Sequence, residues 1–159
     1  MSKKYFFVLL TLILTIGIVG MAAATTILTA KKTSGDDILG TWFVEEKDAK
    51  VEVYKCGNKY CGKIVWLQRP NDESGRPRTD AKNPESSKRQ SPLIGTQVVK
   101  DFTFDASARE WSNGTVYDSR KGKVYSGYIT LKDNNTLSMT GYILGMRWLS
   151  RTSTWTRAK

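Results

Sequence analysis

The 159-residue sequence contains no histidine and only two cysteines. Without histidine the chain has no Ser-His-Asp or Cys-His catalytic unit, no imidazole metal ligand and no histidine-based pH switch. Two cysteines cannot by themselves complete a four-ligand structural zinc site. Acidic residues are also in the minority, since 15 Asp and Glu stand against 25 Lys and Arg, a formal net charge of +10. This excess favours an anionic partner such as nucleic acid, lipid headgroups or an acidic polysaccharide.

The N-terminal residues have the layout of an export signal. Two lysines precede an apolar run, residues 5–24, which ends in three alanines. A basic start, an apolar middle and small residues at the end are typical of a cleaved signal peptide. A helix of about twenty apolar residues also spans a bilayer, so an uncleaved N-terminal anchor is the alternative for residues 1–24. Either way residues 25–38 are expected to be a flexible linker, and residues 39–159 a single domain that is periplasmic, secreted or held at the membrane.

The two cysteines flank a short turn. A two-residue turn centred on Asn58-Lys59 would place Cys56 directly opposite Cys61, and Val51 opposite Trp66. Opposed positions where two strands come closest can hold a cross-strand disulfide, and an exported protein meets an oxidising compartment. The pattern therefore predicts a structural disulfide on the outer face of a hairpin and no metal site.

From Gly40 onward, short β-type runs alternate with turn residues, and no helical stripe is present. A three-residue turn at 133–135 would pair Leu131 with Leu137, and a turn over 145–147 would pair Ile143 with Leu149. Eight or nine strands joined almost entirely by hairpins indicate an up-and-down antiparallel barrel more than a Greek-key sandwich. The fold class predicted is therefore an all-β, lipocalin-like barrel of about eight strands behind an apolar leader helix.

Strand alternation assigns an apolar set to the interior of this barrel. The inward-facing residues are Val51, Val53, Ile64, Trp66, Ile129, Leu131, Leu137, Met139, Ile143, Leu149 and Trp155. Gly127 and Gly141 leave space among them. A barrel of this size is either filled by its own side chains or holds one small ligand, and the sequence leaves both open. Trp66 and Tyr125 are candidate ligand contacts, and Trp155 is a candidate structural residue.

Polar candidates lie at one end of the barrel and in one long connection. Alternation points Arg151 inward, where a guanidinium needs a partner. That partner is either the carboxylate or phosphate of a ligand or an internal ion pair. Residues 68–91 hold three prolines and mixed charges, and a connection this long is a functional lid or a mobile insertion. Within it Asp80, Asn83 and Arg89 are candidate ligand contacts, with a plain solvated connection as the alternative.

Catalytic chemistry has few candidates. No Gly-x-Ser-x-Gly elbow is present. Acid-base hydrolysis would have to use carboxylates such as Glu45, Glu46, Glu110 or Asp118. Glu45 and Glu46 are neighbours, and on a strand they would point to opposite sides. The chain is therefore expected not to be an enzyme and to need no cofactor, with an uncharacterised hydrolase as the alternative.

Ordered motifs carry a family resemblance. Gly40-Thr41-Trp42 resembles the Gly-x-Trp opening of lipocalins, which implies that Trp42 closes one barrel end beneath Arg157 of the last strand, a cation over an aromatic face. The wider series is similar to the domain-of-unknown-function family numbered 2147, small exported bacterial proteins with no established activity. Its further motifs here are Tyr54-Lys55-Cys56-Gly57, Tyr60 to Leu67, Thr79-Asp80 with Asn83-Pro84, Pro92 to Gly95, Gly114 to Asp118 and Arg151 to Arg157.

We therefore expect an exported cell-envelope protein that binds a small apolar or amphipathic anionic ligand inside a barrel. The alternative is an envelope interaction module with a filled barrel, whose basic surface binds anionic lipid, polysaccharide or a protein partner. Nucleic acid is not an expected partner, because export separates the domain from it. Membrane contact is expected through residues 5–24 if the leader is retained.

Overall fold

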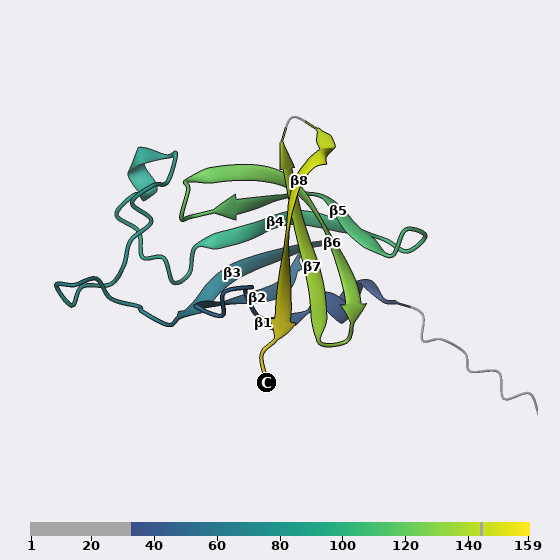
Figure 1. The fold of residues 1–159 in the computed structure, drawn as a ribbon, viewed down its shortest axis with the longest axis horizontal. Helices are drawn as coiled ribbons and strands as arrows, with labels where there is room; N and C mark the ends of the chain where they lie inside the picture. Colours follow the sequence, from purple (N-terminus) through teal and green to yellow (C-terminus); the bar gives the residue numbers. More distant parts are fainter. Residues whose placement is uncertain (1–32, 144) are drawn as a thin grey trace, which may run out of the picture. The chain divides into compact units, whose positions relative to one another are not determined.

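The computed structural model describes residues 33–143 and 145–159, and the predicted signal peptide or anchor lies outside them. Eight antiparallel strands form a closed barrel in which each strand pairs with the next and β8 pairs with β1 (Figure 1). The elements are η1 Gly35–Ile38, β1 Gly40–Phe43, β2 Ala49–Cys56, β3 Lys59–Leu67, η2 Ser86–Lys88, β4 Gln97–Asp105, β5 Glu110–Asp118, β6 Lys123–Asp133, β7 Thr136–Ile143 and β8 Met146–Arg157. The predicted all-β, up-and-down barrel is confirmed. Within the described residues no helix is long and apolar enough to cross a membrane.

The short helix η1 covers one end of the barrel. The indole Nε1 of Trp111 donates to the carbonyl of Gly35 at 3.0 Å, and that of Trp42 donates to the carbonyl of Ile38 at 2.9 Å. Both indoles are fully buried. A buried Trp N–H needs an acceptor, so the helix carbonyls satisfy the two rings that fill this end. We call this the closed end.

Arg157, the last residue of β8, stabilises the closed end. Its guanidinium carbon lies 4.1 Å from the centroid of the Trp42 ring, and Arg157 and Trp42 are paired residues of β8 and β1. The same guanidinium donates to the carbonyls of Leu39, Asp37 and Asn134 at 2.7–2.8 Å. The role that the lipocalin resemblance implied for Trp42 and Arg157 is present in this structure.

Phe102 fills the barrel next to these indoles. It is fully buried, and a side chain at Gly114 or Gly127 would collide with its ring. Gly127 was expected to leave open space, but that space is occupied by Phe102 and Val116. Because Gly114 of β5 and Gly127 of β6 have no side chain, the Phe102 ring packs closely against the backbones of these strands.

The hairpin of β2 and β3 differs from the predicted register. Cys56 pairs with Lys59, so the turn is Gly57-Asn58, and Cys61 lies opposite Tyr54. Gly57 has a φ of 68°, the left-handed value that the first position of a type II′ turn requires. The cysteines are therefore diagonal neighbours, with 5.9 Å between their Cα atoms, and they form the predicted disulfide.

Two further register predictions need correction. The turn at Gly57-Asn58 pairs Val51 with Ile64 instead of Trp66, and a shift between Lys50 and Val51 then pairs Trp66 with Lys50. The Trp66 side chain is 38% exposed. At the end of β7, Ile143 pairs with Met146 and not with Leu149. Ile143 and Leu149 are consequently exposed, whereas they had been assigned to the interior. An irregularity near the end of a strand reverses which side chains face the interior. This explains why Trp66, Ile143 and Leu149 are exposed.

The central register of β6, β7 and β8 agrees with the prediction. Leu131 pairs with Leu137, and Leu137 pairs in turn with Trp155. The turn is shorter than predicted, since Asp133 pairs with Thr136 and only Asn134 and Asn135 remain between them. The odd-numbered positions at the centre of these strands are buried and form the inner wall.

Candidate ligand-binding site

A cavity of about 640 Å³ occupies the half of the barrel away from η1. This volume lies in the range of small-molecule sites in proteins, about 300–1,000 Å³. Its inner wall is mostly apolar. The residues of that wall are Val51, Ile64, Val98, Val116, Tyr117, Tyr125, Met139, Gly141, Arg151, Ser153 and Trp155. The barrel is thus filled at its closed end and hollow at the other, which combines the two alternatives that the sequence left open.

Three connections form the mouth of this cavity. They are the β1–β2 turn (residues 44–48), the β3–β4 loop (residues 68–96) and the β5–β6 turn (residues 119–122). In an up-and-down barrel every second connection lies at the same end, so segments far apart in sequence meet there. Charged side chains gather at this mouth: Glu45, Glu46, Asp48, Asp118, Arg69, Arg78, Arg120, Lys121 and Arg151.

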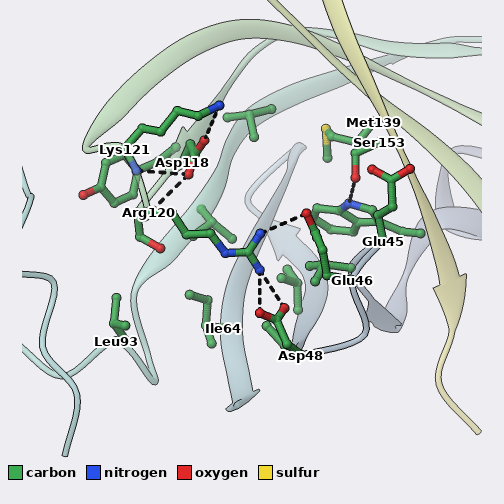
Figure 2. A pocket seen from close by; sticks show the side chains of 18 of the residues that line it. Glu45, Glu46, Asp48, Ile64, Leu93, Asp118, Arg120, Lys121, Met139 and Ser153 are labelled. Atoms are coloured by element: carbon green, nitrogen blue, oxygen red, sulfur yellow. Dashed lines mark hydrogen bonds and ion pairs between the residues drawn. The ribbon is translucent and has the colours of Figure 1, made fainter. Parts of the chain in front are cut away.

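Arg120 joins two of these connections across the mouth. Figure 2 shows its guanidinium between Glu46, at 3.1 Å, and Asp48, whose carboxylate it holds with two hydrogen bonds of 2.6 and 2.8 Å. Partial burial disfavours the guanidinium charge, but Asp48 and Glu46 outweigh it and raise the pKa of Arg120. The pKa of Glu46 is lowered, because its backbone hydrogen bond, Arg120 and Arg151 together outweigh burial. Glu46 therefore remains ionised and paired with Arg120 at neutral pH.

The remaining cations of the mouth divide into two groups. Lys121 pairs with Asp118 at 3.3 Å. Arg69, Arg78 and Arg151 form no ion pair with any carboxylate of the described residues. These three arginines all line the cavity, and all three are exposed. They are the charges at the mouth that are available to a ligand.

The predicted ligand contacts of the long loop lie behind the cavity wall. Asp80 is 2% exposed and accepts hydrogen bonds from the Tyr117 hydroxyl and the Asn83 amide, each at 2.7 Å. Arg89 donates to the carbonyl of Asn83 at 2.8 Å. None of Asp80, Asn83 and Arg89 lines the cavity. Their contacts hold the loop together and fasten it to Tyr117, which does line the cavity; burial and Asp80 raise the pKa of Tyr117.

The other predicted contacts are placed as follows. Tyr125 and Arg151 line the cavity, while Trp66 lies outside it, edge-on to Phe43 at 6.0 Å and beneath the Lys50 amine. Trp155 packs in the core and also lines the cavity, and its Nε1 donates to the hydroxyl of Ser153 at 3.1 Å. The structure therefore gathers Tyr125, Arg151 and Trp155 and excludes Trp66.

Two carboxylates that were expected on opposite sides of a strand both line the mouth. Glu45 and Glu46 both line the mouth, because β1 ends at Phe43 and these residues belong to a turn, where strand alternation does not apply. Glu110 lies elsewhere and pairs with Arg147. The role of Arg120, Arg69 and Arg78 was not found from sequence, because only barrel closure brings their segments to one opening.

A closed eight-stranded barrel with one filled end, a Trp beneath an Arg and an internal cavity defines a lipocalin-like protein. The Helicobacter pylori protein HP1028, described as belonging to the lipocalin family, has the same fold. The TM-score is 0.63 at 21% sequence identity, over 76% of this chain and 82% of that one. The chain belongs to the family of uncharacterised proteins conserved in bacteria (DUF2147), whose model matches residues 40–157. Among curated proteins, none matches this sequence.

Proposed function

We propose that this protein is an exported, non-enzymatic binding protein of the bacterial envelope that takes a small amphipathic anion into its barrel. The apolar part of the ligand occupies the cavity, and its carboxylate or phosphate lies at the mouth. The observation that carries the proposal is the combination of a cavity of about 640 Å³ with three arginines at its mouth that form no ion pair within residues 33–143 and 145–159.

The depth of the cavity supports an apolar ligand chain. Val51, Ile64, Val98 and Met139 are buried residues of the wall, and Gly141 adds no side chain. Each methylene that leaves water for such a wall contributes about 0.8 kcal/mol. A chain of about fifteen carbons therefore gains about 12 kcal/mol, and about 8 kcal/mol, the equivalent of micromolar binding, is left once an association cost of about 4 kcal/mol is subtracted.

The mouth supports an anionic headgroup. Five basic side chains and four acidic side chains line the cavity, a net charge of +1 (5 − 4). Three of the acids are held by Arg120 and Lys121, which leaves Glu45 against Arg69, Arg78 and Arg151. Arginine presents a planar fork that binds carboxylate or phosphate through two hydrogen bonds. An anionic ligand would supply the partner that these guanidinium groups lack.

The state of the mouth carboxylates supports binding rather than hydrolysis. A general acid needs a raised pKa, whereas the pKa of Glu46 is lowered. Asp48 and Asp118 are engaged in ion pairs with neighbouring cations. Export is supported by the apolar leader and by the disulfide between Cys56 and Cys61, since such bonds persist in oxidising compartments.

The proposal is tested with protein purified from its own host and with a fluorescent fatty-acid probe. Native mass spectrometry should detect a bound small molecule, and the probe should bind with a Kd in the micromolar range. Gly141→Leu, which fills the cavity, should abolish probe binding. Arg151→Ala should weaken it about tenfold, because an ionic hydrogen bond is lost.

Lys132→Ala is the matched control, because Lys132 is exposed on β6 and does not line the cavity. It should leave the Kd unchanged. Repeated recovery of empty protein together with no probe binding would rule the proposal out. Binding that Gly141→Leu leaves intact would show that the probe uses another surface.

A further inference from the structure

The exposed large apolar side chains are confined to one end of the barrel. Among the described residues they are Trp66, Ile94, Val124, Ile143, Trp148 and Leu149. Trp66 is near the end of β3, Ile94 precedes β4, Val124 begins β6, and the other three belong to the adjoining ends of β7 and β8. All of these strand ends lie at the mouth. Exposed apolar side chains gathered in one region mark an interaction site. We call these six residues the apolar rim.

The hairpin of β7 and β8 contributes half of the apolar rim. In Figure 1 the end of β7 and the start of β8 lie at the top of the view. Trp148 is 83% exposed, and Leu149 is 52% exposed. The register shift after Tyr142 ends regular pairing there, so Ile143 and Leu149 no longer face a closed interior. An indole that is 83% exposed gains little from folding, and it is accessible to a contact outside the chain.

The charge around the apolar rim is positive. The half of β7 and β8 nearest the mouth, residues 140–152, holds two arginines and no acidic residue. Lys123 is exposed next to Val124, and Arg151 is exposed close after Leu149. Arg147 stacks over Tyr128 at 4.3 Å and pairs with Glu110. Apolar side chains, an indole and unpaired cations therefore occur together at the mouth.

We propose that the apolar rim docks onto the surface of an anionic phospholipid bilayer. Trp favours the headgroup region, where its apolar body and its N–H are both accommodated, and Lys and Arg are drawn to anionic headgroups. The apolar rim offers this match of charge and apolarity for a lipid surface, whereas a single protein partner would need a shaped, contiguous face. The inference rests on the proposed function: docking turns the cavity mouth towards the bilayer, so an amphipathic ligand passes between bilayer and barrel without crossing bulk water.

The test uses the full chain with an environment-sensitive label at Trp148→Cys. The two native cysteines are bonded to each other, so the new thiol reacts alone. Asn134→Cys is the matched control, because Asn134 is exposed in the β6–β7 turn at the closed end. Leu149→Cys is a second rim position in case the first variant folds poorly. Each labelled protein is mixed with vesicles of phosphatidylglycerol and phosphatidylcholine, or of phosphatidylcholine alone.

On the phosphatidylglycerol vesicles the label at position 148 should shift its emission to the blue, and quenching by aqueous acrylamide should fall about twofold. The label at 134 should not change, and added salt should reverse the effect at 148. Equal quenching of the two labels on these vesicles would overturn the proposal. So would equal protection on phosphatidylcholine alone, or cross-linking of position 148 to one envelope protein in place of lipid.

Docking and ligand binding can fail separately. Trp148→Ser should leave the fatty-acid probe binding unchanged in the absence of vesicles, because Trp148 does not line the cavity. If the label at 148 is protected while wild-type protein binds no probe, docking stands and the proposed function falls. If the probe binds while the label at 148 stays accessible, the proposed function stands and docking falls.

Discussion

The Tyr117 hydroxyl donates to the Asp80 carboxylate at 2.7 Å and joins the cavity wall to the long loop 37 residues away in sequence. Asp80 is buried and accepts a second hydrogen bond from the Asn83 amide. A second hydrogen bond joins the loop to the β5–β6 turn, since the Lys82 amine donates to the carbonyl of Arg120 at 2.8 Å. These contacts hold the charged, proline-containing loop against the mouth, although its composition alone is that of a solvated connection.

Asp80→Ala should therefore destabilise the protein and release the loop. The substitution leaves the buried groups of Tyr117 and Asn83 without their acceptor, at a cost of about 3 kcal/mol in the free energy of unfolding. Urea unfolding measures this cost, and hydrogen exchange of the backbone amides in residues 78–92 measures loop opening. Tyr117→Phe removes one hydrogen bond only, so its cost should be about 1 kcal/mol. Equal, small effects of both variants would contradict the role given to Asp80.

Arg157→Lys should destabilise the closed end even though it keeps the charge. A lysine amine cannot both stack on the Trp42 ring and reach the three carbonyls that the guanidinium now serves. We expect the free energy of unfolding to fall by about 2 kcal/mol. Arg109→Lys, at an exposed position, is the control and should change it by less than about 0.5 kcal/mol. If Arg157→Lys leaves the free energy of unfolding unchanged, positive charge alone is enough to stabilise the closed end.

Tyr60 gives the protein a pH dependence at alkaline pH. Burial, together with its hydrogen bond to Asp36 at 2.9 Å, raises the pKa of Tyr60 to about 12. Because the folded state favours the protonated phenol, its contribution to stability is complete below the unfolded pKa, 10.0, and is lost as pH rises towards about 12. Tyr60→Phe should flatten the decline of the free energy of unfolding over this range, measured by urea titration at a series of pH values. Part of the decline in the free energy of unfolding should remain in this variant, because the pKa of Tyr117 is also raised.

The disulfide should stabilise the barrel only moderately. Cys56 and Cys61 close a loop of five residues, and loop-closure entropy for so short a loop amounts to about 2 kcal/mol. Reduction, or the double substitution Cys56→Ala and Cys61→Ala, should lower the free energy of unfolding by that amount without unfolding the protein at room temperature. Circular dichroism during thermal unfolding, with and without reductant, provides the measurement. Loss of the fold on reduction would show that the bond holds more than this hairpin.

Much of the barrel could be predicted from alternation and turn residues. The central pairs of β6, β7 and β8 follow from parity, because the apolar side chains of Ile129, Leu137, Met139 and Trp155 all stand at odd-numbered, inward-facing positions. The alternation of inward-facing and outward-facing residues is broken where a strand contains an irregularity. At Trp66, Ile143 and Leu149 a shift of register moves an apolar side chain from the interior to the surface. Three residues assigned to the interior thus belong to the apolar rim.

The site was harder to predict than the fold. Tyr125 and Arg151 lie on regular parts of strands, and the sequence places them at the cavity correctly. Asp80 and Asn83 lie in an irregular loop, where no periodicity indicates whether a polar side chain faces a ligand or another part of the loop. The structure gives them the second role, since Asp80 is buried behind Tyr117.

The sequence by itself determined the strand pattern, the disulfide, the positive charge and the presence of an apolar leader, because each depends on residues that are close together in the chain. Only the tertiary structure decided which end of the barrel is hollow and which cations are free at its mouth. Arg69, Arg120 and Arg151 meet there because barrel closure brings three distant segments to one opening. Pairing with Glu46 and Asp48 then engages Arg120 and leaves the other two exposed.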